Sequence, residues 1–307
     1  MFRKFLLAAA LVCSTFTAQA NTEFKVLIGQ PQSGGVAMNL QHLSTIAKYN
    51  NLELTPVHKV GAAGAIAMKE FLETTDPKQL MYGGTGTIVS KEVVFKKVPA
   101  YSSSDYRSVI LTSKVPLMLV TPAASNKIQS FDELFRPGCN KRVNVAIGGF
   151  THELFARLLA KHSTCEIVVL VYPSEPGSMA DSAAGVIDIA VTTTDVLTKL
   201  GGKMIASTAS PKDLRYNVQP TFSKYIPDSE FYLFYGLLAS KHMDNTMLNN
   251  LIVEIKKAWE VQEYQKKHPI ADGLSEVQFV YGAEFDKEIV RTTRMLRSIS
   301  EKLDLQK

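Results

Sequence analysis

The stretch FKVLIGQPQSGGVAMNLQHLSTIAK, residues 24–48, runs from a strand through a glycine loop into a helix. Residues 26–28 form a short apolar strand, and Gly34 and Gly35 end the loop after it. Apolar residues then recur at helical spacing, at Met38, Leu40, Leu43, Ile46 and Ala47. The first N–H groups of such a helix have no partners within it, so they suit an anion. Two interpretations stay open: the glycine pair contacts a ligand, or it only forms a tight turn.

The same order of strand, loop and helix recurs along the chain. We expect such strands at 26–28, 52–57, 79–82, 143–147, 167–171 and 187–191. The nearly continuous Val, Ile, Leu and Ala of the last three is typical of parallel strands that are covered on both faces. We therefore predict an α/β fold of two lobes, each a mostly parallel sheet flanked by helices, with the loops gathered at one sheet edge.

Two apolar runs, 108–112 and 117–121, meet at Pro116 and are too close together for a helical crossover. We expect the chain to bend there or to cross between domains, and to cross again near 220–232. The predicted lobes are 21–115 plus 226–307 for the first and 116–225 for the second. Helices are expected at about 88–95, from Ser130 to about 136, and at 245–267 and 282–303.

The first twenty residues predict export. A charged start is followed by an apolar run and by Ala18-Gln19-Ala20, which is typical of a cleaved secretory signal at 1–20. A membrane anchor and lipidation at Cys13 are the weaker alternatives. We expect a periplasmic protein. Its formal charge of +5 includes no tract of Lys and Arg, so nucleic-acid binding is not expected.

Two cysteines, Cys139 and Cys165, follow the signal. Each precedes a predicted strand, and neighbouring parallel strands would place both at the same end of the sheet. In an exported protein this favours a disulfide, which would stabilise the fold by roughly 3 kcal/mol. Two separate buried thiols are the alternative.

Motifs of catalysis are missing from the sequence. It has no Gly-x-Ser-x-Gly elbow and no Gly-Lys-Ser/Thr phosphate loop. His152-Glu153 resembles the start of a zinc-binding helix, but Ala156 occupies the position of the second histidine. We therefore predict no enzyme, no cofactor and no metal site.

Glycines and hydroxyl side chains instead collect where the predicted strands end. Each hydroxyl taken singly could be an ordinary helix cap. Together they predict a polar cleft, poor in charge and rich in hydrogen-bond donors, that suits a small carboxylate. The candidate ligand-binding residues are Ser33, Gly34, Gly35, Gly61, Thr85, Thr87, Gly148, Gly149, Phe150, Thr151, His152, Tyr172, Ser174, Thr192, Thr193 and Thr194.

Several of these loops resemble those of one family in order and spacing. The segments are PQSGGVAM at 31–38, GAAG at 61–64, GGFTHEL at 148–154, YPS at 172–174 and GVID at 185–188, with Pro220-Thr221 and Tyr235-Gly236-Leu237 later. They resemble the substrate-binding proteins of tripartite tricarboxylate transporters, the TctC or Bug receptors. The chain departs from that pattern at Met38, where the family has an acidic residue.

The resemblance implies a two-lobed fold like that of type II periplasmic binding proteins. It implies an exported, monomeric receptor that closes around a small organic di- or tricarboxylate and passes it to the permease subunits of a membrane transporter. Three alternatives stay open: signalling to a membrane sensor kinase, a diverged protein with an altered ligand, and an exported enzyme that reuses the fold.

Overall fold

The opening stretch folds as a strand and a helix. In the computed structural model, which describes residues 22–32, 34–89, 104–173, 175–193, 201–213, 220–261 and 276–304, strand β1 spans Thr22–Ile28 and helix α1 spans Gly35–Lys48. Val26, Leu27 and Ile28 are almost completely buried. The helix begins directly after Gly34, whose extended backbone marks its N-cap.

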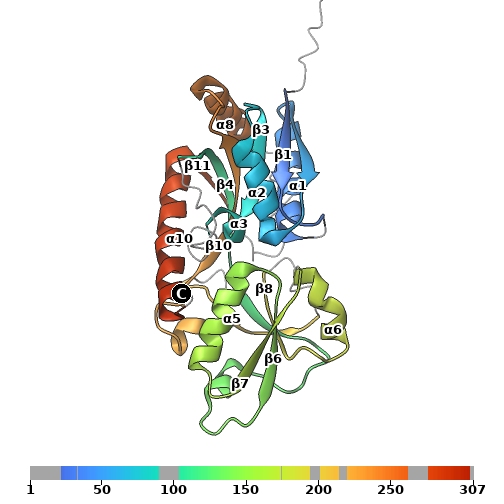
Figure 1. Cartoon of the computed structure of the whole chain (residues 1–307), viewed down its shortest axis with the longest axis vertical. Helices are drawn as coiled ribbons and strands as arrows, with labels where there is room; N and C mark the ends of the chain where they lie inside the picture. The colour runs from blue at the N-terminus through green and yellow to red at the C-terminus, as the bar shows by residue number, and fades with distance from the viewer. Residues whose placement is uncertain are drawn as a thin grey trace, which may run out of the picture.

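The first sheet has six strands in the order β11-β4-β10-β3-β1-β2 (Figure 1). Their bounds are β1 Thr22–Ile28, β2 Leu52–His58, β3 Gln79–Gly84, β4 Tyr106–Pro116, β10 Tyr232–Ser240 and β11 Glu276–Tyr281. The β1 strand is parallel to both of its neighbours, β2 and β3. The remaining three pairings are antiparallel.

The second sheet has five strands in the order β7-β6-β8-β5-β9. Their bounds are β5 Met118–Thr121, β6 Arg142–Ile147, β7 Glu166–Val171, β8 Ile189–Thr192 and β9 Lys203–Ser207. The β6 strand is parallel to β7 and β8, whereas β5 runs antiparallel to β8 and β9.

The α/β class is confirmed, but the sheets are mixed rather than mostly parallel. The chain leaves the first sheet at the end of β4 and enters the second with β5 almost at once, and it returns through β10. These strands join the parallel βα units without helical crossovers, so they lie antiparallel to their neighbours.

Helices cover both sheets. Their bounds are α1 Gly35–Lys48, α2 Ala65–Glu73, α3 Thr85–Ile88, α5 Phe150–His162, α6 Met179–Ala183, α8 Asn245–Glu260 and α10 Gly282–Lys302. Short 3₁₀ turns lie at Ala62–Gly64, Phe131–Phe135, Glu175–Ser178 and Phe222–Lys224. The helix expected after Ser130 is therefore only a 3₁₀ turn, and those expected at 88–95 and 245–267 extend outside the described residues.

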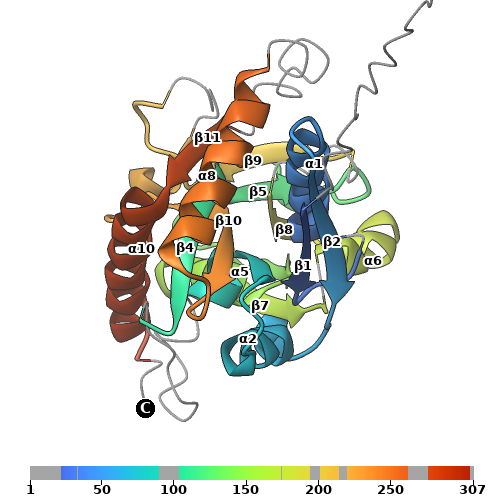
Figure 2. The ribbon, with the colours of Figure 1, turned by 90° about the horizontal axis from the view of Figure 1, so that it is seen from above.

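Two long helices, α8 and α10, pack on the first sheet, and α10 also reaches the second half of the molecule. Both α8 and α10 contact β4, and Figure 2 shows the two helices on the β4 side of the first sheet. Ile46 of α1 and Ala258 of α8 bury each other. The α10 helix packs on β4 and also contacts α5, so it runs from the first half of the molecule to the second.

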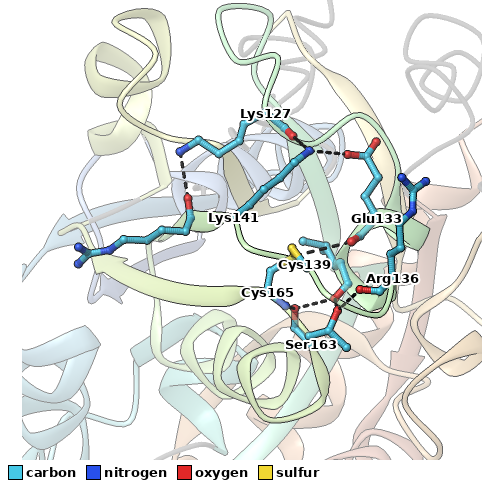
Figure 3. The surroundings of a disulfide bond; sticks show 10 residues. Lys127, Glu133, Arg136, Cys139, Lys141, Ser163 and Cys165 are labelled. Atoms are coloured by element: carbon cyan, nitrogen blue, oxygen red, sulfur yellow. Dashed lines mark hydrogen bonds and ion pairs between the residues drawn. A yellow bond between two sulfur atoms is a disulfide. The ribbon is translucent and has the colours of Figure 1, made fainter.

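The predicted disulfide is confirmed. Cys139 and Cys165 are bonded, with their Cα atoms 4.9 Å apart. The bond lies where β6 and β7 begin, since Arg142 pairs with Glu166 in the parallel register. Figure 3 shows the Lys141 side chain pointing to that of Glu133 beside the bond. Lys141 Nζ lies 3.0 Å from Glu133 Oε2, and this ion pair holds the pKa of Glu133 below its usual range.

Candidate functional site

A cavity of about 620 Å³ lies between the two sheets, at the carboxyl ends of their parallel strands. The first half of the molecule contributes the loops after β1, β2 and β3 and part of β10. The second half contributes the loops after β6 and β7 and the start of α5. Small-molecule sites usually enclose about 300 to 1,000 Å³, so the volume suits a small ligand.

Most of the predicted site residues line this one cavity. They are Gly35, Gly61, Thr85, Thr87, Gly148, Gly149, Phe150, Thr151, His152 and Tyr172. Gly34 lies next to the lining as the N-cap of α1. Ser33, Ser174 and Thr194 lie outside the described residues, as does the predicted signal at 1–20.

Thr192 and Thr193 do not line the cavity. Both are buried, with 1% and 0% of their surface exposed. Thr192 ends β8, which lies in the middle of its sheet, and it pairs with Met118 of β5. A strand end is therefore not enough to place a side chain in the cleft, because the side chain can instead be buried inside the protein.

The start of α1 forms part of the first wall. Gly35 and Val36 line the cavity. The N-cap residue, Gly34, makes no side-chain hydrogen bond to the first N–H groups of the helix. The first turn holds no acidic residue. The first N–H groups of the helix therefore add a partial positive charge to this wall, without a carboxylate beside them.

The start of α5 forms the opposing wall. Its N-cap is Gly149, and Phe150 and Thr151 line the cavity. A Cβ atom on Gly149 would lie 2.9 Å from His152 Nδ1, so a glycine lets the loop approach that ring. Glu153 also lines the cavity, but its Oε1 accepts hydrogen bonds from Arg157 Nε at 2.8 Å and Nη2 at 2.5 Å.

The three loops of the first wall pack against each other through glycines. A Cβ atom on Gly29 would lie 2.3 Å from Gly64 Cα, and one on Gly64 would lie 2.6 Å from Thr87 Oγ1. Four consecutive residues, 61–64, have positive φ, among them Ala62 at 46° and Ala63 at 52°. This left-handed backbone is unfavourable for alanine and often marks a functional loop.

Buried hydrogen bonds hold the floor of the cavity. Thr85 Oγ1 accepts a hydrogen bond from the Phe234 N–H at 2.7 Å, which ties the start of α3 to β10. Behind it, Tyr82 Oη lies 2.6 Å from Thr112 Oγ1, which donates to the Tyr235 carbonyl. The Thr85 hydroxyl therefore positions the loop in addition to lining the cavity.

The two halves approach each other at Gly86. A Cβ atom there would lie 3.4 Å from Thr151 Oγ1, and α3 contacts α5. Tyr172 faces the same cavity, and its hydroxyl donates to Asp181 Oδ2 at 2.5 Å. Burial and this carboxylate raise the pKa of Tyr172 to about 12, so the phenol stays protonated at neutral pH.

Charge is scarce in the cavity. Among the lining residues that the structure describes, Glu153 is the one carboxylate, and none is Lys or Arg. In the described ranges no three His, Cys, Asp or Glu side chains form a metal-binding group. None of the described helices has the length and apolar composition to cross a membrane.

Sequence reasoning missed several lining residues. Gln30, Pro31, Ala62 and Ala63 adjoin predicted loop residues, so loop neighbours were the available signal. Leu233 and Tyr235 come from β10, far along the chain. The antiparallel pairing of β10 with β3 places Tyr235 beside Gly84, which also lines the cavity.

The comparisons with known proteins give distant relatives. No family model matches the chain. It is 23% identical over 216 residues to a UPF0065 protein in the tcbD-tcbE intergenic region of Pseudomonas sp. strain P51. That match covers 66% of this chain and 62% of the relative, less than two thirds of its length.

Solved structures match over nearly the whole chain. The periplasmic binding protein BugD has a TM-score of 0.78 at 14% identity and covers 93% of this chain and 98% of its own. R. palustris Rpa4515 with adipate gives 0.79 at 15%, with 92% and 98% covered. MatC from Rhodopseudomonas palustris with bound malate gives 0.72 at 15%, with 93% and 99% covered. The chain thus has the fold of the Bug-type periplasmic binding proteins, which confirms the resemblance to the TctC and Bug receptors at the level of the fold.

Proposed function

We propose that this protein is an extracytoplasmic solute-binding receptor that closes around a small organic carboxylate and delivers it to a membrane transporter. The observation that carries the proposal is the cavity between the sheets, because the starts of α1 and α5 face it from opposite halves. Backbone N–H groups at helix starts bind anions. The adipate and malate in two structures of the same fold support a carboxylate.

Binding would act by a shift in population between open and closed forms. A ligand that contacts both walls favours the closed form, because only there are all of its contacts made. We propose that residues 21–115 with 226–307 move against residues 116–225. The hinges would lie at 112–121 and 220–232, where the chain crosses between the sheets.

The proposal also includes export of the protein, its oligomeric state and its partner. The segment 1–20 would be removed as a signal peptide, and the mature protein would act in the periplasm as a monomer beside the permease subunits. We propose a binding protein rather than an enzyme. The lining of the cavity is poor in charge, which supports this. Its one carboxylate among the described residues, Glu153, accepts a hydrogen bond from Arg157.

Thermal unfolding of the mature chain with a panel of mono-, di- and tricarboxylates tests the receptor. We expect at least one class of acid to raise the melting temperature, since a ligand at 100 times its dissociation constant stabilises by about 2.7 kcal/mol. The amide of each active acid is the control and should have no effect. A panel in which no acid stabilises the protein would contradict the proposal.

A further inference from the structure

Tyr172 lines the cavity from the second half of the molecule, directly after β7. Its backbone N–H donates a hydrogen bond to the carbonyl of Ile147 at 2.9 Å. Ile147 ends β6 and also lines the cavity. This bond joins the loop after β7 to the end of β6, so the backbone of Tyr172 is fixed at the edge of the cavity.

The side chain of Tyr172 is held by a residue from outside the cavity. Its hydroxyl donates to Asp181 Oδ2 at 2.5 Å, and the two residues are 9 positions apart in the chain. Asp181 belongs to α6, and none of the residues of α6, all of which the structure describes, lines the cavity. The hydrogen bond therefore closes the loop between β7 and α6 and links α6 to the cavity wall.

The hydrogen bond is of the strong, charge-assisted kind. A distance of 2.5 Å is at the short end of the range for a hydroxyl that donates to a carboxylate. A phenol has one proton to donate, and in Tyr172 this proton is engaged by Asp181. Burial and Asp181 raise the pKa of Tyr172 to about 12, so the proton stays on the phenol at neutral pH. Tyr172 therefore offers a ligand its ring rather than a hydrogen-bond donor.

Asp181 is itself firmly placed. Its backbone carbonyl accepts a hydrogen bond from the Val186 N–H at 2.9 Å. Gly185 has a φ of 73°, the left-handed conformation that often follows the end of a helix. The chain then reaches the buried Asp188, whose Oδ2 accepts a hydrogen bond from the N–H of Asn144 in β6 at 2.8 Å. The end of α6 is thus tied to the second sheet, and Asp181 provides a fixed point for the ring.

We propose that Asp181 is a positioning residue for the cavity, which holds the ring of Tyr172 in the second wall before a ligand arrives. This inference rests on the proposed receptor function. A side chain that is ordered in advance costs no further ordering when the ligand binds. Without Asp181 the ligand would have to order the ring itself, which should weaken affinity by about five- to tenfold.

Calorimetric titration with the acid that most stabilises the natural protein tests this role. Asp181→Ala and Tyr172→Phe remove the same hydrogen bond, so each should weaken binding by about five- to tenfold, and the double variant should lose no more than either one. Asp181→Asn keeps an oxygen acceptor and should lose less. Tyr281→Phe is the matched control, since burial also raises the pKa of Tyr281 to about 12 but this residue is not part of the cavity lining. Its affinity should be unchanged.

Nuclear magnetic resonance of isotope-labelled tyrosine reports on the hydrogen bond without any ligand. The Tyr172 signal is assigned by its loss in Tyr172→Phe. In the natural protein it should titrate with a pKa of about 12. In Asp181→Asn it should titrate at a lower pH, because the negative charge that opposes ionisation of the phenol is gone. A role of Asp181 in the fold alone would not predict this shift together with non-additive losses of affinity.

The outcomes separate this inference from the receptor itself. If an acid binds but Asp181→Ala binds it equally tightly, or if the losses add in the double variant, the positioning role is overturned and the receptor stands. An equal loss in Tyr281→Phe would also overturn it. An unchanged titration of Tyr172 in Asp181→Asn overturns the hydrogen bond on which the role depends. Failure of every acid to bind the natural protein overturns the receptor, and the positioning role with it.

Discussion

The two walls of the cleft present similar helix starts but are held in place by different means. In the first wall, three glycine loops pack backbone against backbone at Gly29 and Gly64, and buried hydroxyls tie the strands behind them. The sheet behind the second wall is held at the opposite ends of its strands, by a disulfide and by Asp188, which accepts hydrogen bonds from Lys127 Nζ at 2.7 Å and from the Asn144 N–H at 2.8 Å. The first half therefore has close packing at the cavity itself, whereas the second half has covalent and ionic bonds away from the cavity.

Loss of the disulfide should have the largest effect and should be confined to the second half. The bond joins residues 26 positions apart, and closing such a loop stabilises the fold by roughly 3.5 kcal/mol. We expect the double variant Cys139→Ser, Cys165→Ser to lose about this much in urea unfolding. Reduction of the natural protein should reproduce the loss. Faster hydrogen exchange in β1–β3 rather than in β6 and β7 would contradict the comparison.

Gly29→Ala should destabilise the first wall in the way that loss of the disulfide destabilises the second half. The new Cβ would lie 2.3 Å from Gly64 Cα, and backbone cannot yield as a flexible side chain can. We expect a loss of about 3 kcal/mol in the free energy of unfolding. Gly86→Ala is the matched control, because its Cβ meets its nearest atom at 3.4 Å. Equal stability of the two variants would show that the glycine packing does not hold this wall.

Low pH should reduce the folding stability of the first half, because it protonates Glu288 of α10. Burial raises the pKa of this carboxyl, but hydrogen bonds from Arg291 and Lys114 outweigh burial and hold the pKa below its ordinary value of 4.5. The ionised form therefore stabilises the fold above pH 4.5, and the gain is lost as the pH falls through the folded pKa. We expect Glu288→Gln to lose about 2 kcal/mol at pH 7.

The pH series of urea unfolding curves checks this. The difference between Glu288→Gln and the natural protein should shrink below pH 4.5. Glu284→Gln is the control on the same helix, since Glu284 and its partner Lys287 are both well exposed and their pair should contribute little. A Glu288→Gln loss that is independent of pH would show that packing, not charge, explains it.

The sequence predicts features that depend on local patterns better than features that depend on long-range pairing. Local patterns were enough for the glycine loops and for the disulfide, because neighbouring parallel strands place Cys139 and Cys165 together. They did not predict where the side chain of Thr192 lies, since a strand end does not reveal whether that side chain faces the cavity or is buried elsewhere. They also could not place Tyr235 in the cavity, because that position depends on pairing between β10 and β3. Sequence therefore predicts loops better than it predicts which loops share a wall.

The smallest effect should come from a wedge between the walls. Gly86 meets Thr151 at the floor of the cleft, so Gly86→Phe places a ring where the halves approach. If the walls must meet to hold a ligand, affinity for the acid that most stabilises the natural protein should fall about tenfold, which is about 1.4 kcal/mol. Gly86→Ala should bind normally.

Small-angle scattering with saturating acid should show the Gly86→Phe protein more extended than the natural one. Unchanged affinity and unchanged scattering would mean that the walls do not close on each other at this point, and the proposed movement of 116–225 against the rest of the chain would then have to be abandoned.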